Sequence, residues 1–138
     1  MLLEIVVAHR WHVLALVEAR GRCPVKEALD TLSRTDQVAH AEIAARLDHL
    51  ASCGAPWDER RSRHLGHGIF QLKTPRGVRV LYFFDRHRVI VCTALVRKPK
   101  PRVLRLLIAR AREVRDAYRA AVVTGTVVVE GGRDDHRL

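Results

Sequence analysis

Basic side chains recur between residues 73 and 102, next to runs of apolar residues. Lys73 closes the run I-F-Q-L-K, and Arg79 stands one residue inside the run V-R-V-L-Y-F-F. A charged group is costly to desolvate without a partner, so Arg79 either reaches water or a carboxylate from a strand end or holds an anion. If the two runs pair as a hairpin, Lys73 and Arg79 are near neighbours and repel each other unless an anion lies between them. A phosphate group would satisfy both cations.

Such a cluster suits the cleavage of RNA by attack of a ribose 2′-hydroxyl on its own phosphate. This reaction needs a base for the hydroxyl, cations for the charge that develops on the phosphorane, and an acid for the leaving oxygen. Arg79 and Lys73 could stabilise the charge, and Lys98, His64 or His67 could handle protons. A solvated basic face without chemistry is the alternative. The residues expected to contact the nucleic acid around this cluster are Arg76, Arg97, Lys100 and Arg102.

The sequence offers little support for metal, nucleotide or serine chemistry. The pair His64-x-x-His67 has no third or fourth ligand at usable spacing, and we expect no metal site. No G-x-S-x-G, Walker-type or dinucleotide glycine pattern is present, so no cofactor is expected either. The three cysteines, Cys23, Cys53 and Cys92, are odd in number and lack metal-ligand spacing, which is typical of reduced thiols in a cytoplasmic protein.

Length and charge narrow the class of protein further. The 138 residues are enough for one domain with a single core. Lys and Arg number 25 against 15 acidic residues, a net charge of +10, which favours a polyanionic partner, nucleic acid before anionic membrane, unless the charge only reflects an arginine-rich composition. The apolar opening Leu2–Val7 is too short to span a bilayer and contains an acid. We therefore expect a cytoplasmic protein without a membrane partner.

The basic cluster needs a sheet to position it. Strands are predicted at roughly 69–74, 78–84 and 89–96, because these runs are rich in β-branched and aromatic residues. The breaks after residue 74 and at Asp85–Arg88 suit hairpin turns. The three strands should therefore be antiparallel neighbours, with 78–84 in the centre.

Alternation assigns the side chains of these strands to two faces, because residues i and i+2 point the same way. Gln71 and Lys73 share one face of their strand. Arg79 shares a face with Leu81 and Phe83. The two cations are thus predicted on the same face of the sheet.

The residues before this sheet segment predict one further strand and two helices. Val13–Val17 reads as a strand, and residues 2–8 as an additional strand or a loose N-terminal arm. Pro24 suits the first position of a short amphipathic helix. Ser33 or Thr35 can cap a second helix.

The remaining segments complete the order of elements. The second helix stops at Gly54, and the polar connection Ala55–Gly68 is expected to be mobile. Residues 122–138 form a C-terminal tail that could add an edge strand or fray, after a single domain over residues 1–121. A last helix starts at Pro101 and buries one side. The residues of that side are Val103, Leu104, Leu107, Ala111, Val114 and Tyr118.

Four segments in this order resemble a known family. They read L-G-H-G-I-F-Q-L-K at 65–73, R-V-L-Y-F-F-D at 79–85, A-L-V-R-K at 94–98, and Pro101 before a helix rich in Ala and Arg. They resemble the phage-derived Gp49-like, or HigB-type, branch of the RelE/ParE toxin superfamily over roughly residues 11–120. The resemblance implies a small RelE-like α+β domain, in the order β-α-α-β-β-β-α, with a twisted, mainly antiparallel sheet packed against helices.

The resemblance also implies a function and roles for individual residues. The family contains toxins of type II toxin–antitoxin pairs, typically ribosome-dependent, metal-independent endoribonucleases that cut mRNA and inhibit translation. Arg79 matches the arginine that contacts the scissile phosphate in RelE-like nucleases, and Lys73 stands where a basic residue closes the preceding strand. Arg97 and Lys98 stand at the family's lysine pair. The implied partners are a cognate helix-turn-helix antitoxin, bound in a hetero-oligomer, and mRNA on the ribosome.

One departure from the family pattern concerns a tyrosine. RelE-like nucleases often carry one in or just before the last helix, whereas this region here reads Arg102-Val103-Leu104-Arg105, and Tyr118 lies too far along to replace it. Two alternatives to the nuclease therefore stay open. One is a non-enzymatic ParE-like toxin acting on DNA gyrase, and the other is a catalytically degenerate phage-derived protein that only binds nucleic acid.

Overall fold

The computed structural model describes residues 1–55 and 62–131. The helical segments are the 3-10 turn η1 (Ala19–Gly21) and the helices α1 (Pro24–Thr35), α2 (Gln37–Cys53) and α3 (Pro101–Thr124). The strands are β1 (Leu2–Ala8), β2 (His12–Leu16), β3 (Ser62–His64), β4 (Phe70–Lys73), β5 (Val78–Asp85), β6 (Val89–Arg97) and β7 (Val128–Glu130).

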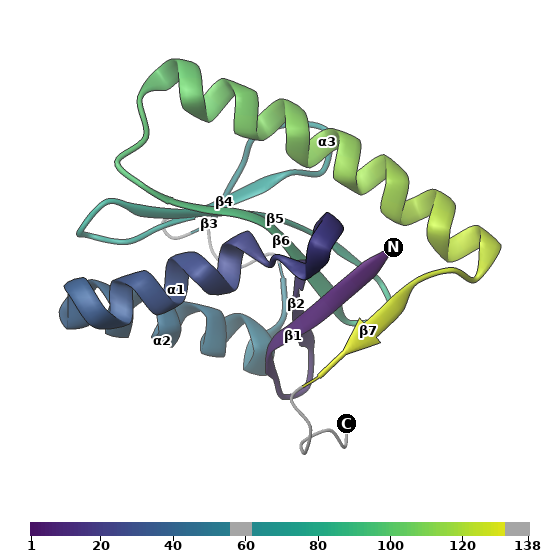
Figure 1. Cartoon of the computed structure of the whole chain (residues 1–138), viewed down its shortest axis with the longest axis horizontal. Coiled ribbons are helices and arrows are strands. Elements are labelled where there is room, and N and C mark those ends of the chain that lie inside the picture. The colour runs from purple at the N-terminus through teal and green to yellow at the C-terminus, as the bar shows by residue number, and fades with distance from the viewer. Residues whose placement is uncertain (56–61, 132–138) are drawn as a thin grey trace.

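One sheet separates two helical layers (Figure 1), with α1 and α2 on one face and α3 on the other. Its strands follow the order β3-β4-β5-β6-β2-β1-β7. The pairs β2–β6 and β1–β7 are parallel, and the other neighbours are antiparallel. The predicted α+β class, with a mainly antiparallel sheet packed against helices, is confirmed.

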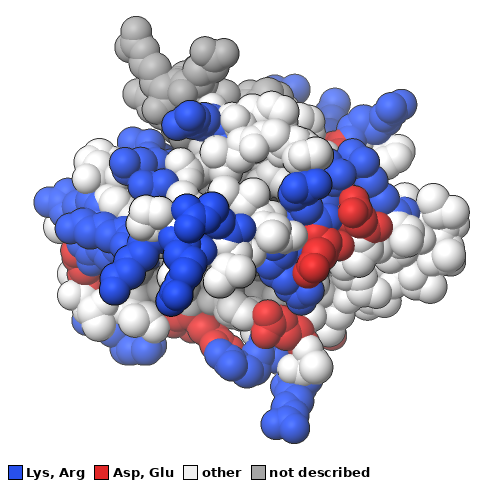
Figure 2. Space-filling view, turned by 90° about the horizontal axis from the view of Figure 1, so that it is seen from above, with Lys and Arg blue, Asp and Glu red and all other residues white. Residues whose placement is uncertain are grey.

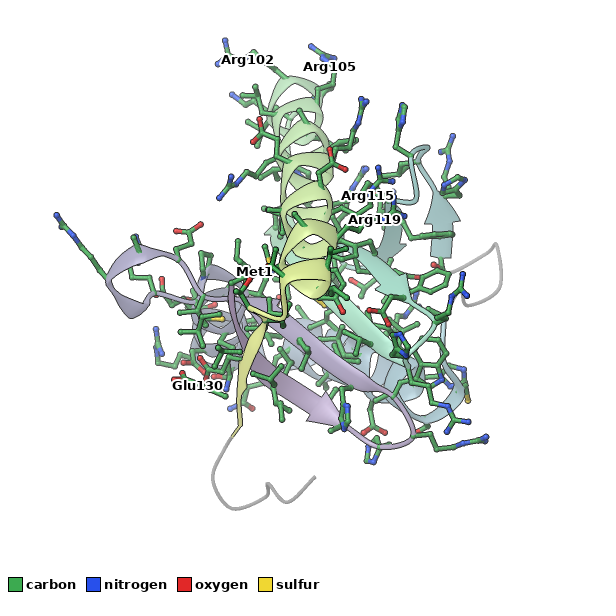
Figure 3. All side chains as sticks on the ribbon, turned by 90° about the vertical axis from the view of Figure 1, so that its right-hand side faces the viewer. Met1, Arg102, Arg105, Arg115, Arg119 and Glu130 are labelled. Carbon is green, nitrogen blue, oxygen red and sulfur yellow. The ribbon has the colours of Figure 1, made fainter. Side chains whose placement is uncertain are left out.

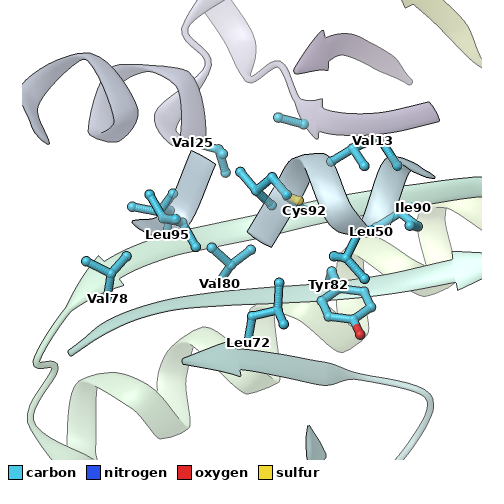
Figure 4. Close-up of a cluster of buried hydrophobic side chains, with 14 of the residues drawn as sticks. Val13, Val25, Leu50, Leu72, Val78, Val80, Tyr82, Ile90, Cys92 and Leu95 are labelled. Atoms are coloured by element: carbon cyan, nitrogen blue, oxygen red, sulfur yellow. The ribbon is translucent and has the colours of Figure 1, made fainter. Parts of the chain in front are cut away.

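The larger part of the core lies between the sheet and the α1–α2 pair (Figure 4). Leu72, Val80 and Tyr82 are fully buried on this face of β4 and β5. Leu50 of α2 and Ile90 of β6 close over them. Each such apolar side chain stabilises the fold by about 1.5–3 kcal/mol relative to an exposed one, which fixes the register of the central strands.

The opposite face of the sheet packs against the C-terminal part of α3. Ala111, Val114 and Tyr118 meet Phe83 and Ile69 there, and all five are buried. The alternation predicted for β5 is thus confirmed, because Val80 and Tyr82 belong to one cluster and Phe83 to the other. Arg79 shares the face of Phe83, so its side chain points toward the α3 side.

The N-terminal half of α3 does not pack as predicted. None of the residues from Pro101 to Arg110 is buried, and Val103 is 40% exposed. Figure 1 shows this end of the helix rising away from the sheet, so its apolar stripe does not reach the strands. The stripe expected from Val103 onward becomes a buried contact only at Ala111.

The cap of α2 also differs from the prediction. The N-cap is Asp36, whose carboxylate accepts a hydrogen bond from Ala39 N at 3.1 Å. Ser33 and Thr35 lie within α1, and their hydroxyls donate to backbone carbonyls of the preceding turn. Because these hydroxyls are engaged in α1, neither caps α2. The predicted end at Gly54 is confirmed, with φ of +90°.

The connection 55–68 contains a strand that the sequence did not predict. Ser62–His64 forms the edge strand β3 and pairs with β4. Ser62 is buried and shares a hydrogen bond with the Tyr82 hydroxyl. The residues Ser62, Arg63 and His64 have no pattern typical of a strand, so this strand is recognised only from its pairing with β4. Residues 56–61 of the expected mobile connection lie outside the described residues.

The two ends of the described chain meet at one side of the sheet. Residues 2–8, left open between a strand and a loose arm, form β1, because Leu3 is fully buried. The Met1 ammonium donates to Thr126 O at 2.9 Å, and β7 adds an edge strand next to β1. The expected domain limit at residue 121 lies inside α3. The frayed end expected near residues 132–138 lies outside the described part of the chain.

Within residues 1–55 and 62–131, no helix combines the length and the hydrophobicity that crossing a membrane requires.

Candidate functional site

The three residues predicted to act in catalysis line one hollow of about 370 Å³ on the α3 side of the sheet. Lys73 closes β4, Arg79 opens β5, and Lys98 follows β6. We call this site the basic hollow. Its lining is Lys73, Pro75, Gly77, Arg79, Lys98 and Pro99.

Strand pairing brings the three cations together. Lys73 pairs directly with Arg79 across β4 and β5, as predicted. On the other side of β5, Arg79 pairs with Val96, two residues before Lys98. Arg46 of α2 fixes the end of β4 by donating from Nη1 to Lys73 O at 2.6 Å. The hollow is therefore held by sheet hydrogen bonds and one helix contact.

Lys98 adopts a backbone conformation that residues other than glycine rarely take. Its φ is +47°, in the left-handed region. Its backbone N donates to Gly77 O at 2.8 Å, which holds it there. A Cβ at Gly77 would lie 2.7 Å from Lys98 Cγ, so the lysine stem crosses the space that glycine leaves free. Strained backbone kept in place by its surroundings is frequent at functional sites.

Arg79 has an unsatisfied donor in the described structure. Its Nη1 donates to Gln71 Oε1 at 3.2 Å, while its Nε is buried and has no hydrogen-bond partner among the described residues. A buried donor without a partner costs about 1–3 kcal/mol, so the fold holds this guanidinium in place at a cost to stability. Lys73, Arg79 and Lys98 form no ion pair with an acidic side chain of the described residues. The hollow thus suits an anion that offers several oxygens.

Arg76 and Arg97, expected among the nucleic-acid contacts, are paired with α2. Arg76 forms an ion pair with Glu42 at 2.7 Å, and Arg97 with Asp36 at 2.8 Å. The hydrogen bond from Ala39 N, followed by that from Arg97, holds the pKa of Asp36 below its usual range. The structure does not bring these two guanidinium groups into the basic hollow.

Lys100 and Arg102, the other expected contacts, lie at the start of α3. Both are exposed, and the helix has no acidic residue before Glu113. Figure 3 shows Arg102 and Arg105 at the end of α3 that is far from the sheet. Figure 2, which looks down on the α3 side of the molecule, shows Lys and Arg side chains across this face, with acidic side chains in few places. This face provides a long-range attraction for polyanions.

The two histidines considered for proton transfer lie elsewhere. His64 stacks on Phe70 with ring centroids 4.7 Å apart, and its Nε2 accepts from Gly68 N at 3.2 Å. His67 is exposed in the turn before β4. Neither lines the basic hollow. Among the described residues, no group of three or more His, Cys, Asp or Glu side chains is arranged to hold a metal ion.

Sequence reasoning missed two polar residues on the α3 side. Gln71 orients Arg79, and alternation already placed it beside Lys73, but a neutral amide carried no signal of its role. Arg115 of α3 is largely buried and its Nε has no partner among the described residues. A Cβ at Gly68 would lie 3.0 Å from Arg115 Nη1, so the glycine makes room for this arginine.

The fold and the basic hollow define a class of small, basic α+β domains with clustered cations at one end of the central strand. A family model described as "Phage derived protein Gp49-like (DUF891)" matches residues 27–116. This match covers well over half of the chain, and the protein belongs to that family. No curated protein matches the chain. Membership of the family is consistent with the toxin of a toxin–antitoxin pair, and with an antitoxin as its partner.

Proposed function

We propose that this protein is a RelE/ParE-superfamily, HigB-type toxin that cleaves mRNA on the ribosome through the basic hollow. The observation that carries the proposal is the meeting of Lys73, Arg79 and Lys98 in one hollow without an acidic partner among the described residues. An anion would relieve the repulsion among these three cations, and a nucleic-acid phosphate is the anion that the basic α3 face attracts.

In this mechanism each cation has a separate task. The Arg79 guanidinium, oriented by Gln71, donates to the scissile phosphate. Lys73, its neighbour across the strand pair, adds charge as the phosphorane forms. The Lys98 ammonium donates the proton that the leaving 5′ oxygen requires. Removal of any one of them weakens the stabilisation of the same transition state.

The proton of the 2′-hydroxyl must leave by another route. The lining of the hollow contains no imidazole or carboxylate that could accept it. We therefore assign this base to the ribosome. If the ribosome supplies the base and the toxin positions and stabilises the phosphate, the nuclease works only on translated mRNA.

Nucleic-acid binding outside the hollow is proposed for Lys100 and Arg102, which extend the basic surface along α3. Arg76 and Arg97 would act at the rim only after exchanging their ion pairs with α2 for a phosphate. The exchange is costlier for Arg76, because its partner Glu42 is mostly buried and would be left without a cation.

One observation favours the gyrase-directed alternative. Tyr118 donates to the Asp85 carboxylate at the opposite end of β5, so it does not supply the tyrosine that RelE-like nucleases often use. A toxin that docks on gyrase without chemistry needs no such group. The same observation is compatible with a degenerate protein that binds nucleic acid and leaves it intact.

Induction in a bacterial host separates these functions. We expect growth arrest and new 5′ ends within reading frames, mapped by primer extension on abundant transcripts. These cuts should disappear when an inhibitor empties the ribosome of mRNA. Arrest with intact transcripts and a DNA-damage response would establish the gyrase-directed toxin instead. Growth without arrest would establish the degenerate protein.

A further inference from the structure

A second and larger cavity lies at the opposite end of β5 from the basic hollow. It measures about 790 Å³ and opens between the end of β5, the following turn and the last turns of α3. We call it the α3–β5 cleft. Phe84 in its lining follows Arg79 by five residues, so the two sites are separated by roughly 16 Å at about 3.3 Å per strand residue. A molecule seated in the cleft need not enter the hollow.

The cleft has an apolar floor and an exposed apolar wall. Phe83 and Tyr118 form the buried floor, with ring centroids 5.4 Å apart. Phe84 also lines the cleft, but its ring packs against Trp11 and Phe70 on the other face of the sheet. The wall is Val122 and Val123, which are 45% and 86% exposed. The two valines give the open side of the cleft a small apolar surface that a partner could cover.

The rim of the cleft is positively charged. Arg86 and Arg119 are exposed and form no ion pair within the described residues. Figure 3 shows Arg119 on the side of α3 that faces the central strands. Asp85 is the acidic residue of the lining, and its carboxylate already accepts from the Tyr118 hydroxyl and from His87 N. These neutral donors leave the carboxylate its negative charge, but the two arginines outnumber it, so the rim stays positive.

These features select one kind of occupant. An apolar floor and wall require apolar side chains, and a positive rim requires carboxylates next to them. An RNA strand would meet the arginines but would leave Val122 and Val123 without an apolar partner. An amphipathic helical segment with an apolar face and acidic flanks satisfies both.

We propose that the α3–β5 cleft binds an acidic amphipathic segment of a partner protein. The chemistry of the cleft carries this inference by itself. The identification of the partner as the antitoxin rests on the proposed function. If the partner is the antitoxin, it binds at a surface remote from the basic hollow. Different substitutions should then abolish catalysis and antitoxin binding.

Two synthetic peptides test the chemistry of the cleft. One is a fluorescent helical peptide of about 16 residues with Leu at positions i, i+3, i+4 and i+7, Glu beside this apolar face and Ala elsewhere. The other carries Lys in place of Glu. Fluorescence anisotropy with the full-length protein should show binding of the acidic peptide, weakened by salt, and at least about tenfold weaker binding of the basic one. Equal binding of the two peptides would overturn the proposal.

Substitutions locate the binding. Arg119→Glu and Val123→Asp should each weaken binding of the acidic peptide by about tenfold or more. Both side chains are exposed, and equal thermal midpoints confirm that the variants are folded. Arg112→Glu is the matched control, because it reverses an exposed arginine on α3 outside the cleft. An equal loss in the control would show a diffuse charge effect and reject the site.

Two further measurements test peptide binding in the cleft independently of the proposed nuclease activity. Arg79→Ala should bind the acidic peptide as the wild type does, whether or not the protein arrests growth. Arg119→Glu should arrest growth like the wild type if the nuclease is correct. Displacement of the peptide by an RNA oligonucleotide in the wild type and Arg79→Ala alike would show that the cleft is an RNA surface, and would contradict the proposal.

Discussion

The side chain of Lys98 lies across Gly77, in the space that a glycine leaves free. A Cβ at Gly77 would approach Lys98 Cγ to 2.7 Å. The backbone of Lys98 is held at a φ of +47° by the hydrogen bond from its N to Gly77 O. The ammonium thus reaches the hollow from a strained backbone, and its position depends on a neighbour with no side chain.

Replacing Lys98 by glycine should separate stability from activity. Glycine relieves the left-handed strain but gains freedom in the unfolded chain, so the free energy of unfolding should change by less than about 1 kcal/mol. Growth arrest should nevertheless be lost, because the ammonium is gone. Urea unfolding of the purified variant and growth curves after induction measure the two effects.

Arg88→Gly is the control for this experiment. Arg88 also has a positive φ, of +64°, and lies in the turn after β5, outside the basic hollow. The same backbone change there should leave growth arrest intact. Full arrest by Lys98→Gly would remove the lysine from the proposed mechanism.

The pairing of Tyr118 with Asp85 predicts how stability changes at high pH. Burial, and then the hydrogen bond to Asp85, raise the pKa of Tyr118 above its ordinary value. The folded protein therefore favours the neutral phenol. The resulting stabilisation is fully present below the unfolded pKa of about 10 and is lost as the pH rises above it.

Tyr118→Phe removes this contribution. At neutral pH the variant should lose about 1–2 kcal/mol of unfolding free energy, because Asp85 loses a donor. Above about pH 10 the wild type should lose stability faster than the variant, so that their difference narrows. Urea unfolding of both proteins, at neutral pH and above about pH 10, measures this difference in unfolding free energy. A difference that stays constant would show that the hydroxyl does not titrate as its surroundings predict.

The cysteines should differ sharply in reactivity. Burial raises the pKa of Cys92 to about 12 and that of Cys23 in the same direction, whereas Cys53 is exposed. An aromatic disulfide reagent at about pH 8 should therefore modify one thiol rapidly in the native protein. All three should react in denaturant. Rapid reaction of two thiols in the native protein would contradict the buried placement of Cys23 or Cys92.

Much of the sheet could be predicted because composition and alternation are local signals. The strand expected at 78–84 is β5 at Val78–Asp85, since its apolar run is buried on both faces. The same alternation placed Lys73 beside Arg79, which the register confirms. The strand β3 could not be predicted, because Ser62–His64 owes its conformation to pairing with β4.

The details of the hollow depend on tertiary contacts that no sequence pattern records. The left-handed backbone of Lys98 follows from its hydrogen bond to Gly77, which is distant in sequence. The ion pairs of Arg76 and Arg97 with α2 follow from packing of the helix against the sheet. A run of basic letters predicts a basic surface, but it does not show which cations are already paired.

The central claim is that Arg79 holds the scissile phosphate, and Arg79→Ala tests it most directly. We would induce the wild type, Arg79→Ala and a control in parallel and score growth and cleaved transcripts. The control is Arg34→Ala, which removes an exposed arginine of α1. Circular dichroism would confirm that each is folded. We predict arrest and cleavage by the wild type and Arg34→Ala, and neither by a folded Arg79→Ala. Full arrest with cleaved transcripts in Arg79→Ala would contradict the account.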